Sequence, residues 1–311
     1  MALLLLSALA LSYGAQVAAK AAVDLVASFA VYGPGAINRA PFLLSLRASG
    51  YTGKIVLAVG TKLADDDQRT MRELDVEFFP VKTFSSSDHS CGDFCMETPF
   101  GPMHVQVGRY FFYRDVIQNA GLEKKSRVLI SDFRDTYFQQ HPFHNAYFST
   151  DGPSLDLLFF EETSWTITKS FWNFTSWWIS TCFGEEAVAD LEAYPVLCSG
   201  TTMGTAQGVA NYLHIFLATL QRQLEHGTEQ QKADCRGIAG IDQGIHNYVA
   251  LKGLVNEFVP VMLPNGHGPV NTANGKPQPA RPLRQNELGI VLNQGGQPSP
   301  VVHQFDRCPE V

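Results

Sequence analysis

Short apolar runs alternate along the chain with segments in which apolar residues recur at helical spacing. The first run, residues 25–31, has the length of a strand and ends at Gly33, Pro34 and Gly35, which interrupt regular structure. The predicted strands are residues 25–31, 54–59, 76–81 and 127–132, and the predicted helices are residues 40–49, 65–74, 105–120 and 206–220. Strands that alternate with helices predict an α/β fold, with a mostly parallel sheet flanked by helices on both faces.

Length, composition and charge indicate what kind of protein this chain is. The chain has 311 residues, of which 45% are hydrophobic and 17% are charged. This composition is typical of a packed globular protein, and the length predicts one domain with excursions. The formal net charge is -7 at pH 7. Because such a chain has no basic field to attract phosphates, we expect no nucleic-acid partner.

The N-terminus has the pattern of a targeting segment. Residues 3–11 are almost wholly apolar, and small residues dominate the stretch 13–19 that follows. The segment resembles a secretory signal peptide, although no Lys or Arg precedes the apolar run. We therefore expect a signal peptide over residues 1–19 and a location in the lumen of the ER or Golgi, or outside the cell. A buried first helix is the alternative; the run is too short for a membrane span, which needs about 20 residues.

The cysteines agree with an oxidising compartment. Six cysteines are an even number, compatible with up to three disulfides whose pairing the sequence leaves open. Cys91 and Cys95 lie four positions apart, which favours a local disulfide over half of a zinc site. Asn173, Phe174 and Thr175 form an N-glycosylation sequon in an aromatic setting, so Asn173 is either glycosylated or buried.

Candidate chemistry follows the strand predicted over residues 127–132. In parallel sheets, ligands bind at the carboxyl ends of the strands, and this strand ends on Asp132, with Arg134 and Asp135 close behind. Two carboxylates beside open positions suit a hard divalent cation that also binds phosphate oxygens. Arg134 is suited to neutralise the acids or a diphosphate. An ion network that merely pins the loop is the alternative.

This acidic segment resembles a known family. Residues 131–143 are similar to the strand-end motif of GT-A nucleotide-sugar glycosyltransferases, in which Asp-x-Asp precedes an aromatic stretch and a Pro-Phe. Here the acids stand as D-x-R-D, at Asp132 and Asp135. The resemblance implies a GT-A-like (Rossmann-like) single domain over residues 20–311. It also implies that Asp135 binds Mn²⁺ or Mg²⁺, and that Asp132 binds the metal or the hydroxyls of the sugar or ribose. A metal-independent enzyme that uses Arg134 as its cation is the alternative.

Two later segments match the same family in the same order. Asp242, Gln243 and Asn247 are similar to the Asp-Gln-x-x-x-Asn motif of glycogenin-like transferases. The resemblance implies that Asp242 and Gln243 lie beside the reacting sugar, and Asn247, one turn later on the helix, should face the same side. His303 follows two apolar residues and resembles the late strand-end histidine that ligates the metal.

Two weaker matches complete the predicted site. Residues 196–205 form a predicted small-residue turn that resembles the family's Ser-Gly stretch, which lines donor and acceptor sugar; the residues concerned are Ser199, Gly200 and Thr201. Arg109 resembles the diphosphate-contacting arginine, and Arg307 is suited to a phosphate.

Together the matches imply a glycosyltransferase, a hexosyl- or pentosyltransferase of open stereochemistry. It would move sugar from a nucleotide-diphosphate donor to a hydroxyl of a glycan, protein or small molecule. The alternative is a secreted, catalytically inactive protein of the same fold that binds a sugar or nucleotide, which the altered acidic motif favours. A phosphatase of D-x-D-x-T type is excluded because Arg134 occupies the second acidic position, and no G-x-S-x-G elbow of a serine hydrolase is present.

Overall fold

A computed structural model describes residues 23–85, 91, 94–148, 155–168, 174–255, 260–273 and 283–308. The predicted signal peptide and Asn173 of the sequon lie outside these described residues. Among the described residues, the α-helices are α1 (Ala36–Arg39), α2 (Phe42–Ala48), α3 (Asp65–Glu73), α4 (Val105–Asn119), α5 (Phe174–Phe183), α6 (Glu185–Ala189), α7 (Ala206–His226), α8 (Glu229–Gly237) and α9 (Ile241–Leu251).

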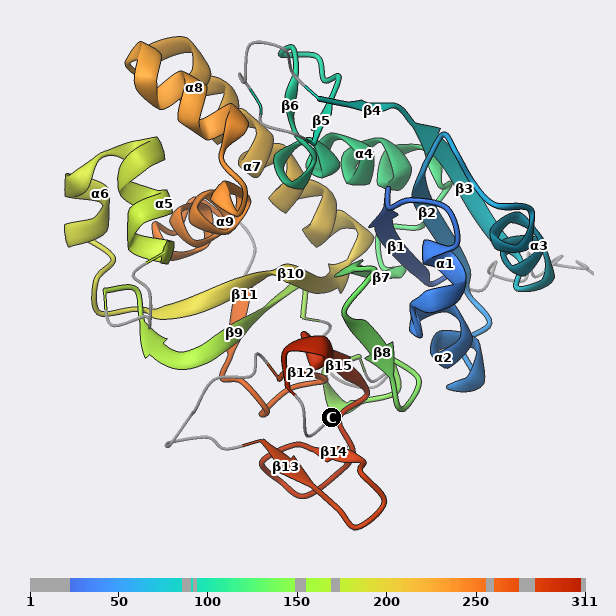
Figure 1. Cartoon of the computed structure of the whole chain (residues 1–311). Coiled ribbons are helices and arrows are strands. Elements are labelled where there is room, and N and C mark those ends of the chain that lie inside the picture. The colour runs from blue at the N-terminus through green and yellow to red at the C-terminus, as the bar shows by residue number, and fades with distance from the viewer. Residues whose placement is uncertain are drawn as a thin grey trace, which may run out of the picture.

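A seven-stranded sheet forms the centre of the molecule (Figure 1). In spatial order its strands are β11 (Pro260–Leu263), β9 (Leu157–Thr166), β10 (Pro195–Thr205), β7 (Arg127–Asp132), β1 (Leu25–Ala30), β2 (Lys54–Gly60) and β3 (Val76–Val81). Every neighbouring pair is parallel except the two pairs that β10 makes with β7 and β9. The prediction of a mostly parallel sheet is confirmed.

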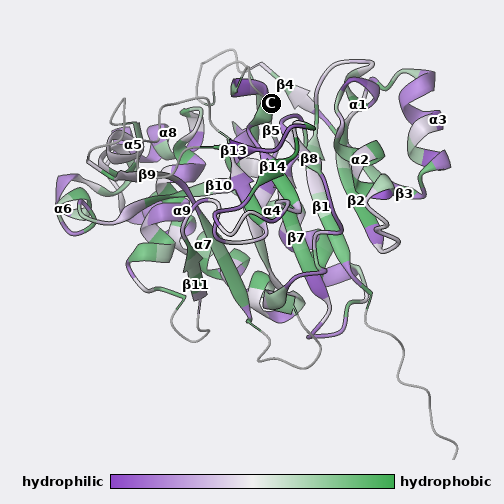
Figure 2. Cartoon of the chain, turned by 90° about the horizontal axis from the view of Figure 1, so that it is seen from below, coloured by the Kyte–Doolittle hydropathy of each residue, from purple (hydrophilic) through white to green (hydrophobic). Residues whose placement is uncertain are grey.

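Both faces of the sheet are covered, which explains why its strands are continuous apolar runs. All six residues of β1 are buried. Leu25, Ala27 and Phe29 join a core with α4 and α7, whereas Val26 and Ala30 join a second core with α2. Figure 2 shows the hydrophobic residues concentrated along β7, β1 and β2. The predicted helices on both faces are therefore confirmed.

Shorter strands form three small sheets, and one of them positions the site. The shorter strands are β4 (Thr83–Phe84), β5 (Cys95–Met96), β6 (Met103–His104), β8 (Thr136–Phe138), β12 (Val270–Thr272), β13 (Arg284–Gln285), β14 (Val291–Leu292) and β15 (Val301–His303). Strand β15 lies between β12 and β8 and pairs antiparallel with β8, with His303 opposite Thr136. This register brings β15 beside the loop that follows β7.

One predicted element is wrong. Residues 196–205, predicted as a turn, lie within the eleven-residue strand β10. The antiparallel pairs with β7 and β9 supply its backbone with partners on both sides. Its small residues serve close packing instead of a turn: a Cβ on Gly200 would lie 2.4 Å from Cε1 of His303.

All six cysteines lie within the described residues. Cys91 and Cys95 are joined, which confirms the predicted local disulfide, and a second disulfide joins Cys182 to Cys235 and thus α5 to α8. Cys198 and Cys308 are free thiols. Two disulfides therefore form, fewer than the three that the count allows. No helix in the described part of the chain combines the length and apolar character needed to cross a bilayer.

Candidate functional site

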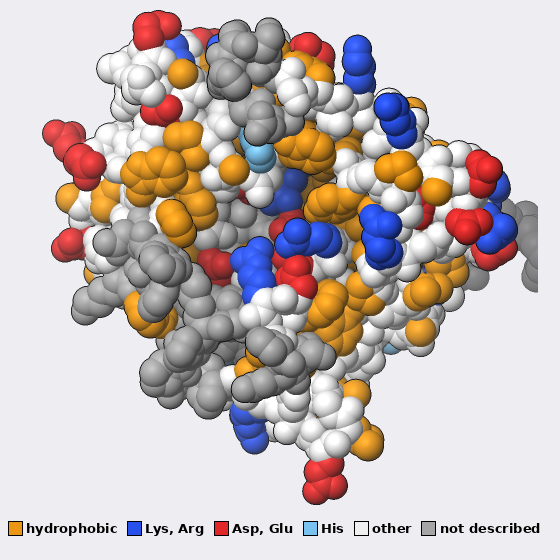
Figure 3. Space-filling model, viewed as in Figure 1, with side chains coloured by type: hydrophobic (Ala, Val, Ile, Leu, Met, Phe, Trp, Pro, Cys, Tyr) orange, Lys and Arg blue, Asp and Glu red, His pale blue; other side chains and the backbone are white. Residues whose placement is uncertain are grey.

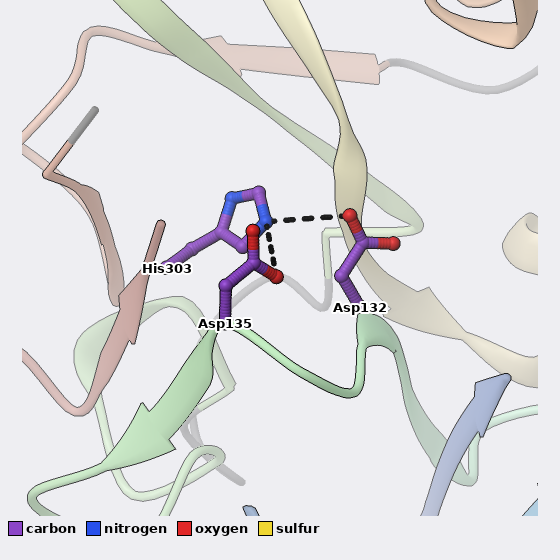
Figure 4. A group of neighbouring side chains, drawn as sticks. All are labelled: Asp132, Asp135 and His303. Carbon is purple, nitrogen blue, oxygen red and sulfur yellow. Dashed lines mark ion pairs between the residues drawn. The ribbon is translucent and has the colours of Figure 1, made fainter. Parts of the chain in front are cut away.

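Two carboxylates and an imidazole meet at the carboxyl end of β7 (Figure 4). Nε2 of His303 lies 3.5 Å from Oδ2 of Asp132 and 3.6 Å from Oδ1 of Asp135. The candidate ligand atoms of the three residues all lie within 4.8 Å of one another. His303 is fully buried and Asp135 is 4% exposed. The predicted metal ligands are therefore brought together from β7, the loop before β8, and β15.

A buried phenylalanine sets the course of the loop that carries the acids. Phe133 is fully buried, and its ring lies 5.1 Å from that of Phe42 on α2. Phe138, which ends β8, packs on the same Phe42 ring at 5.1 Å. The apolar side chain between the acids thus anchors the loop on one face of the sheet and leaves Asp132 and Asp135 beside the imidazole.

Arg109 joins this cluster to α9. Its guanidinium contacts Oδ1 of Asp132 through Nη1, and its Nη2 lies 2.8 Å from Oδ2 of Asp242. Ser199 on β10 donates to the same Asp242 oxygen at 3.0 Å. Arg109 is 8% exposed and Asp242 is 2% exposed. The predicted diphosphate arginine, the predicted catalytic acid and one predicted sugar contact therefore lie in one connected network.

The surroundings shift the pKa values of Asp132 and Asp242 in opposite directions. Burial raises the pKa of Asp242, and the Arg109 guanidinium only partly opposes this effect. Burial also acts to raise the pKa of Asp132, but Arg109 and His303 hold it well below its usual range. Burial disfavours the imidazolium of His303, yet the pKa of His303 is raised because the sulfur of Cys198 and the carboxylates of Asp135 and Asp132 favour the charged form. Two acids whose pKa values are shifted in opposite directions can take different roles at one pH.

Two buried nitrogen atoms in the cluster have no hydrogen-bond partner, namely Nε of Arg109 and Nε2 of His303. Buried polar atoms are normally hydrogen-bonded, so these two point to a missing ligand. The donor set of two carboxylates and one imidazole fits a divalent cation. The imidazole favours a transition ion such as Mn²⁺ over Mg²⁺, which prefers oxygen ligands.

A cavity of about 200 Å³ opens beside the acids. Charged residues line it together with apolar and aromatic ones; the lining residues are Phe29, Val31, Tyr32, Phe94, His104, Val105, Gln106, Arg109, Asp132, Arg134, Asp135 and Arg307. Figure 3 shows Lys/Arg and Asp/Glu side chains gathered around a hollow on this face. Burial raises the pKa of Tyr32 to about 12, so its hydroxyl remains a hydrogen-bond donor at neutral pH.

The two remaining predicted arginines lie at the cavity rim. Arg307 is in a short 3₁₀ turn (Phe305–Arg307), and its Nη2 lies 3.3 Å from Oδ2 of Asp135. Nη2 of Arg134 lies 3.0 Å from Oδ2 of Asp306. The Arg134 side chain is 60% exposed. Both cations are therefore accessible to a ligand in the cavity.

Other predicted site residues have different partners. Asn247 is fully buried, and its amide bonds to the backbone N–H and C=O of Leu197, each at 2.8 Å. Asn247 thus links α9 to β10, whereas the sequence predicted that it contacts the sugar. Thr201 is fully buried, and Gly200 packs against His303 and Asp132. Gln243 donates to Oε2 of Glu162 at 2.7 Å.

Sequence reasoning missed Glu162 and Cys198. Glu162 on β9 accepts from Gln243 and, at 3.0 Å, from Nε2 of Gln304, the residue after His303. It lies inside β9 and not at the end of that strand, so the reasoning applied to Asp132, an acid at a strand end, would not have identified Glu162. Cys198 lies 3.4 Å from Nδ1 of His303, and no feature of the sequence indicates this contact.

No protein-family model matches the chain, and a comparison with curated proteins finds no match. The functional interpretation therefore depends on the site itself: its charges, its burial and the atoms that lack partners.

Proposed function

We propose that this protein is a glycosyltransferase that moves a sugar from a nucleotide-diphosphate donor to an acceptor hydroxyl. The observation that carries the proposal is the convergence of Asp132, Asp135, His303, Arg109 and Asp242 in one connected network, of which Arg109, Asp132 and Asp135 line a cavity. These residues come from segments far apart in the sequence, and charged groups are costly to bury together without a function or full pairing. The resemblance of the acidic, Asp-Gln and late histidine segments to GT-A enzymes supports the same activity.

The chemistry that such a reaction requires is charge stabilisation of the leaving diphosphate. Asp132, Asp135 and His303 would hold a divalent cation, Mn²⁺ by preference, which when bound supplies positive charge to the diphosphate. Arg109, Arg134 and Arg307 line the same cavity and contribute further positive charge before the bond breaks. Charges arranged in advance lower the barrier because they need no reorganisation during the reaction.

Asp242 is the candidate group for the acceptor. Its raised pKa brings it closer to the operating pH of a general base than an ordinary carboxyl. The bonds from Ser199 and Arg109 fix one of its oxygens. Asp242 would then orient the acceptor hydroxyl or take its proton as the new glycosidic bond forms.

A second candidate function is a binding protein of the same fold that holds a sugar nucleotide without turnover. The observation that favours it is the pairing of the acids with arginines of the chain itself. Arg109 contacts Asp132 and Asp242, and Arg307 contacts Asp135. Acids neutralised in this way have less need of a cation, so metal-independent transfer would also agree with this pairing.

A donor hydrolysis assay separates these functions. Purified protein would be incubated with a panel of UDP-, GDP- and TDP-sugars in Mn²⁺, in Mg²⁺ and in EDTA, and release of the nucleotide diphosphate would be measured. We expect hydrolysis of at least one donor with Mn²⁺, and a loss of about 100-fold in Asp135→Asn. The matched control is Asp115→Asn, an exposed acid on α4 whose side chain is 57% accessible.

The outcomes of this assay are distinct. Hydrolysis with Mn²⁺ that EDTA abolishes supports the metal-dependent transferase, and hydrolysis that EDTA leaves unchanged supports a metal-independent one. A donor that raises the melting temperature by mass action but is never hydrolysed, with either ion, overturns the proposed enzyme in favour of the binding protein.

A further inference from the structure

The imidazole of His303 has a further polar neighbour, Cys198, on the side away from the acids. Sγ of Cys198 lies 3.4 Å from Nδ1 of His303. Cys198 is 1% exposed and His303 is fully buried. Four of the six cysteines form disulfides, whereas Cys198 remains a free thiol. The thiol therefore lies directly behind the proposed cation site.

The two ring nitrogens of His303 have different requirements. Nε2 faces the carboxylates of Asp132 and Asp135 and has no hydrogen-bond partner. In a neutral imidazole, one nitrogen carries the proton and the other carries the lone pair. For Nε2 to offer its lone pair to a cation, Nδ1 must carry the proton and needs an acceptor. Sγ of Cys198 is the acceptor that the structure provides.

We propose that Cys198 is a positioning residue of the cation site, which accepts the Nδ1 hydrogen of His303 and thereby aims the Nε2 lone pair between Asp132 and Asp135. The inference rests on the proposed function, because it concerns the cation that the transferase would use. Cys198 itself touches neither the cavity nor the acids. Partners of this kind, behind a metal-ligating histidine, fix its tautomer and its orientation.

The packing of β10 leaves the ring little freedom to turn. A Cβ on Gly200, two residues after Cys198, would lie 2.6 Å from Nε2 of His303. The backbone carbonyl of His303 accepts from the N–H of Ala273 at 2.8 Å.

The test measures cation binding in the absence of any donor. Mn²⁺ affinity would be determined by electron paramagnetic resonance, from the signal of the free ion, for wild type, Cys198→Ala and Cys198→Ser. We expect Cys198→Ala to bind Mn²⁺ about 10- to 100-fold more weakly. Cys198→Ser retains an acceptor and should stay within about five-fold of wild type.

A packing control and a second readout separate positioning from stability. Val196→Ala removes volume from the same strand at a residue that is 2% exposed; it should lower the melting temperature and leave the Mn²⁺ affinity unchanged. With diamagnetic Zn²⁺ in place of Mn²⁺, ¹⁵N NMR of labelled histidine should identify a proton on Nδ1 of His303 in wild type, and a disturbed pattern in Cys198→Ala.

Equal Mn²⁺ affinity in wild type and Cys198→Ala would overturn the positioning role and leave the proposed function standing. An equal loss of affinity in Val196→Ala would also overturn it, because packing alone would then explain the effect. If wild type binds no Mn²⁺, the cation site is wrong, and both the metal-dependent transferase and this inference fail.

Discussion

The two ends of β7 each carry an ion pair, and the pairs differ in how completely they are satisfied. At the amino end, Arg127 binds both carboxylate oxygens of Asp24, at 2.8 and 2.6 Å. Its remaining nitrogen donates to the carbonyl of Phe143 at 3.1 Å. Every nitrogen of this guanidinium has a partner, and the pair links the amino ends of the central strands β7 and β1.

At the carboxyl end, the guanidinium of Arg109 is divided between Asp132 and Asp242. Its Nε is buried without a partner, as is Nε2 of His303. A bidentate pair with all donors used stabilises a fold, whereas divided charges with unpartnered atoms leave bonding capacity for a ligand. The contrast supports the carboxyl end as the place of the proposed function, and experiments that compare the two ends test it.

The largest expected difference is in the rate of sugar transfer. Asp242→Asn should lower the rate by about 10²- to 10⁴-fold, because an amide cannot take the proton of the acceptor. The matched change at the other end, Asp24→Asn, breaks the pair with Arg127 and should lower the free energy of unfolding by about 1 to 2 kcal/mol. Its rate per folded molecule should stay within about two-fold of wild type. Steady-state kinetics and urea unfolding measure these quantities, and equal rate losses in both variants would remove the distinction between the two ends.

A smaller effect is expected from a single methyl group at the carboxyl end. In Gly200→Ala, the new Cβ would lie 2.4 Å from Cε1 of His303 and 2.7 Å from Oδ2 of Asp132, so one of these side chains must move. Misplaced catalytic groups cost about 100-fold in rate, and we expect a loss of that order in Mn²⁺-dependent donor hydrolysis. Gly33→Ala is the control, since a Cβ there meets no atom within 4 Å. A Gly200→Ala enzyme as active as the control would contradict the tight contact of β10 with His303.

The smallest expected effect concerns stability and pH. The pKa of Asp132 is lowered, so its carboxylate stabilises the native state above the unfolded pKa of about 3.9, and this contribution is lost as the pH falls through the native pKa. The pKa of Asp242 is raised, chiefly by burial, so its contribution is present at low pH and is lost as the pH rises through the native pKa.

Urea unfolding between pH 3 and pH 7 tests these opposite signs. Relative to wild type, Asp132→Asn should lose stability as the pH rises, and Asp242→Asn should gain it, each by about 1 kcal/mol. If the stability of both variants changes with pH in parallel with that of wild type, the folded protein does not shift the pKa of either carboxyl.

Elements that depend on local pattern were predictable. The strand predicted over residues 127–132 is β7 with the same bounds, because an apolar run that ends in an acid marks both its burial and its end. Helix α9 begins at Ile241, directly after Gly240 in the left-handed conformation, so Asp242 lies in its first turn, as the sequence indicates. The alternation of strand and helix was sufficient to predict the parallel sheet.

Elements that depend on long-range pairing were not predictable. The Ser-Gly stretch of β10 has the composition of a turn, and only its pairing with β7 and β9 makes it a strand. The amide of Asn247 was expected to face a sugar, but it binds the backbone of Leu197, fifty positions away in the sequence. Local composition carries no information about such partners.

The apolar runs of the sequence indicate which residues end the buried strands, and therefore where charged side chains such as Asp132 and His303 emerge from the sheet. The bridge that Arg109 makes between two acids and the place of Cys198 behind His303 depend on tertiary packing, across 133 and 105 positions of the chain respectively. The physical reason is that hydrophobic periodicity acts over a few residues, whereas the distances within the site result from the packing of β7, β10, β15, α4 and α9 against one another.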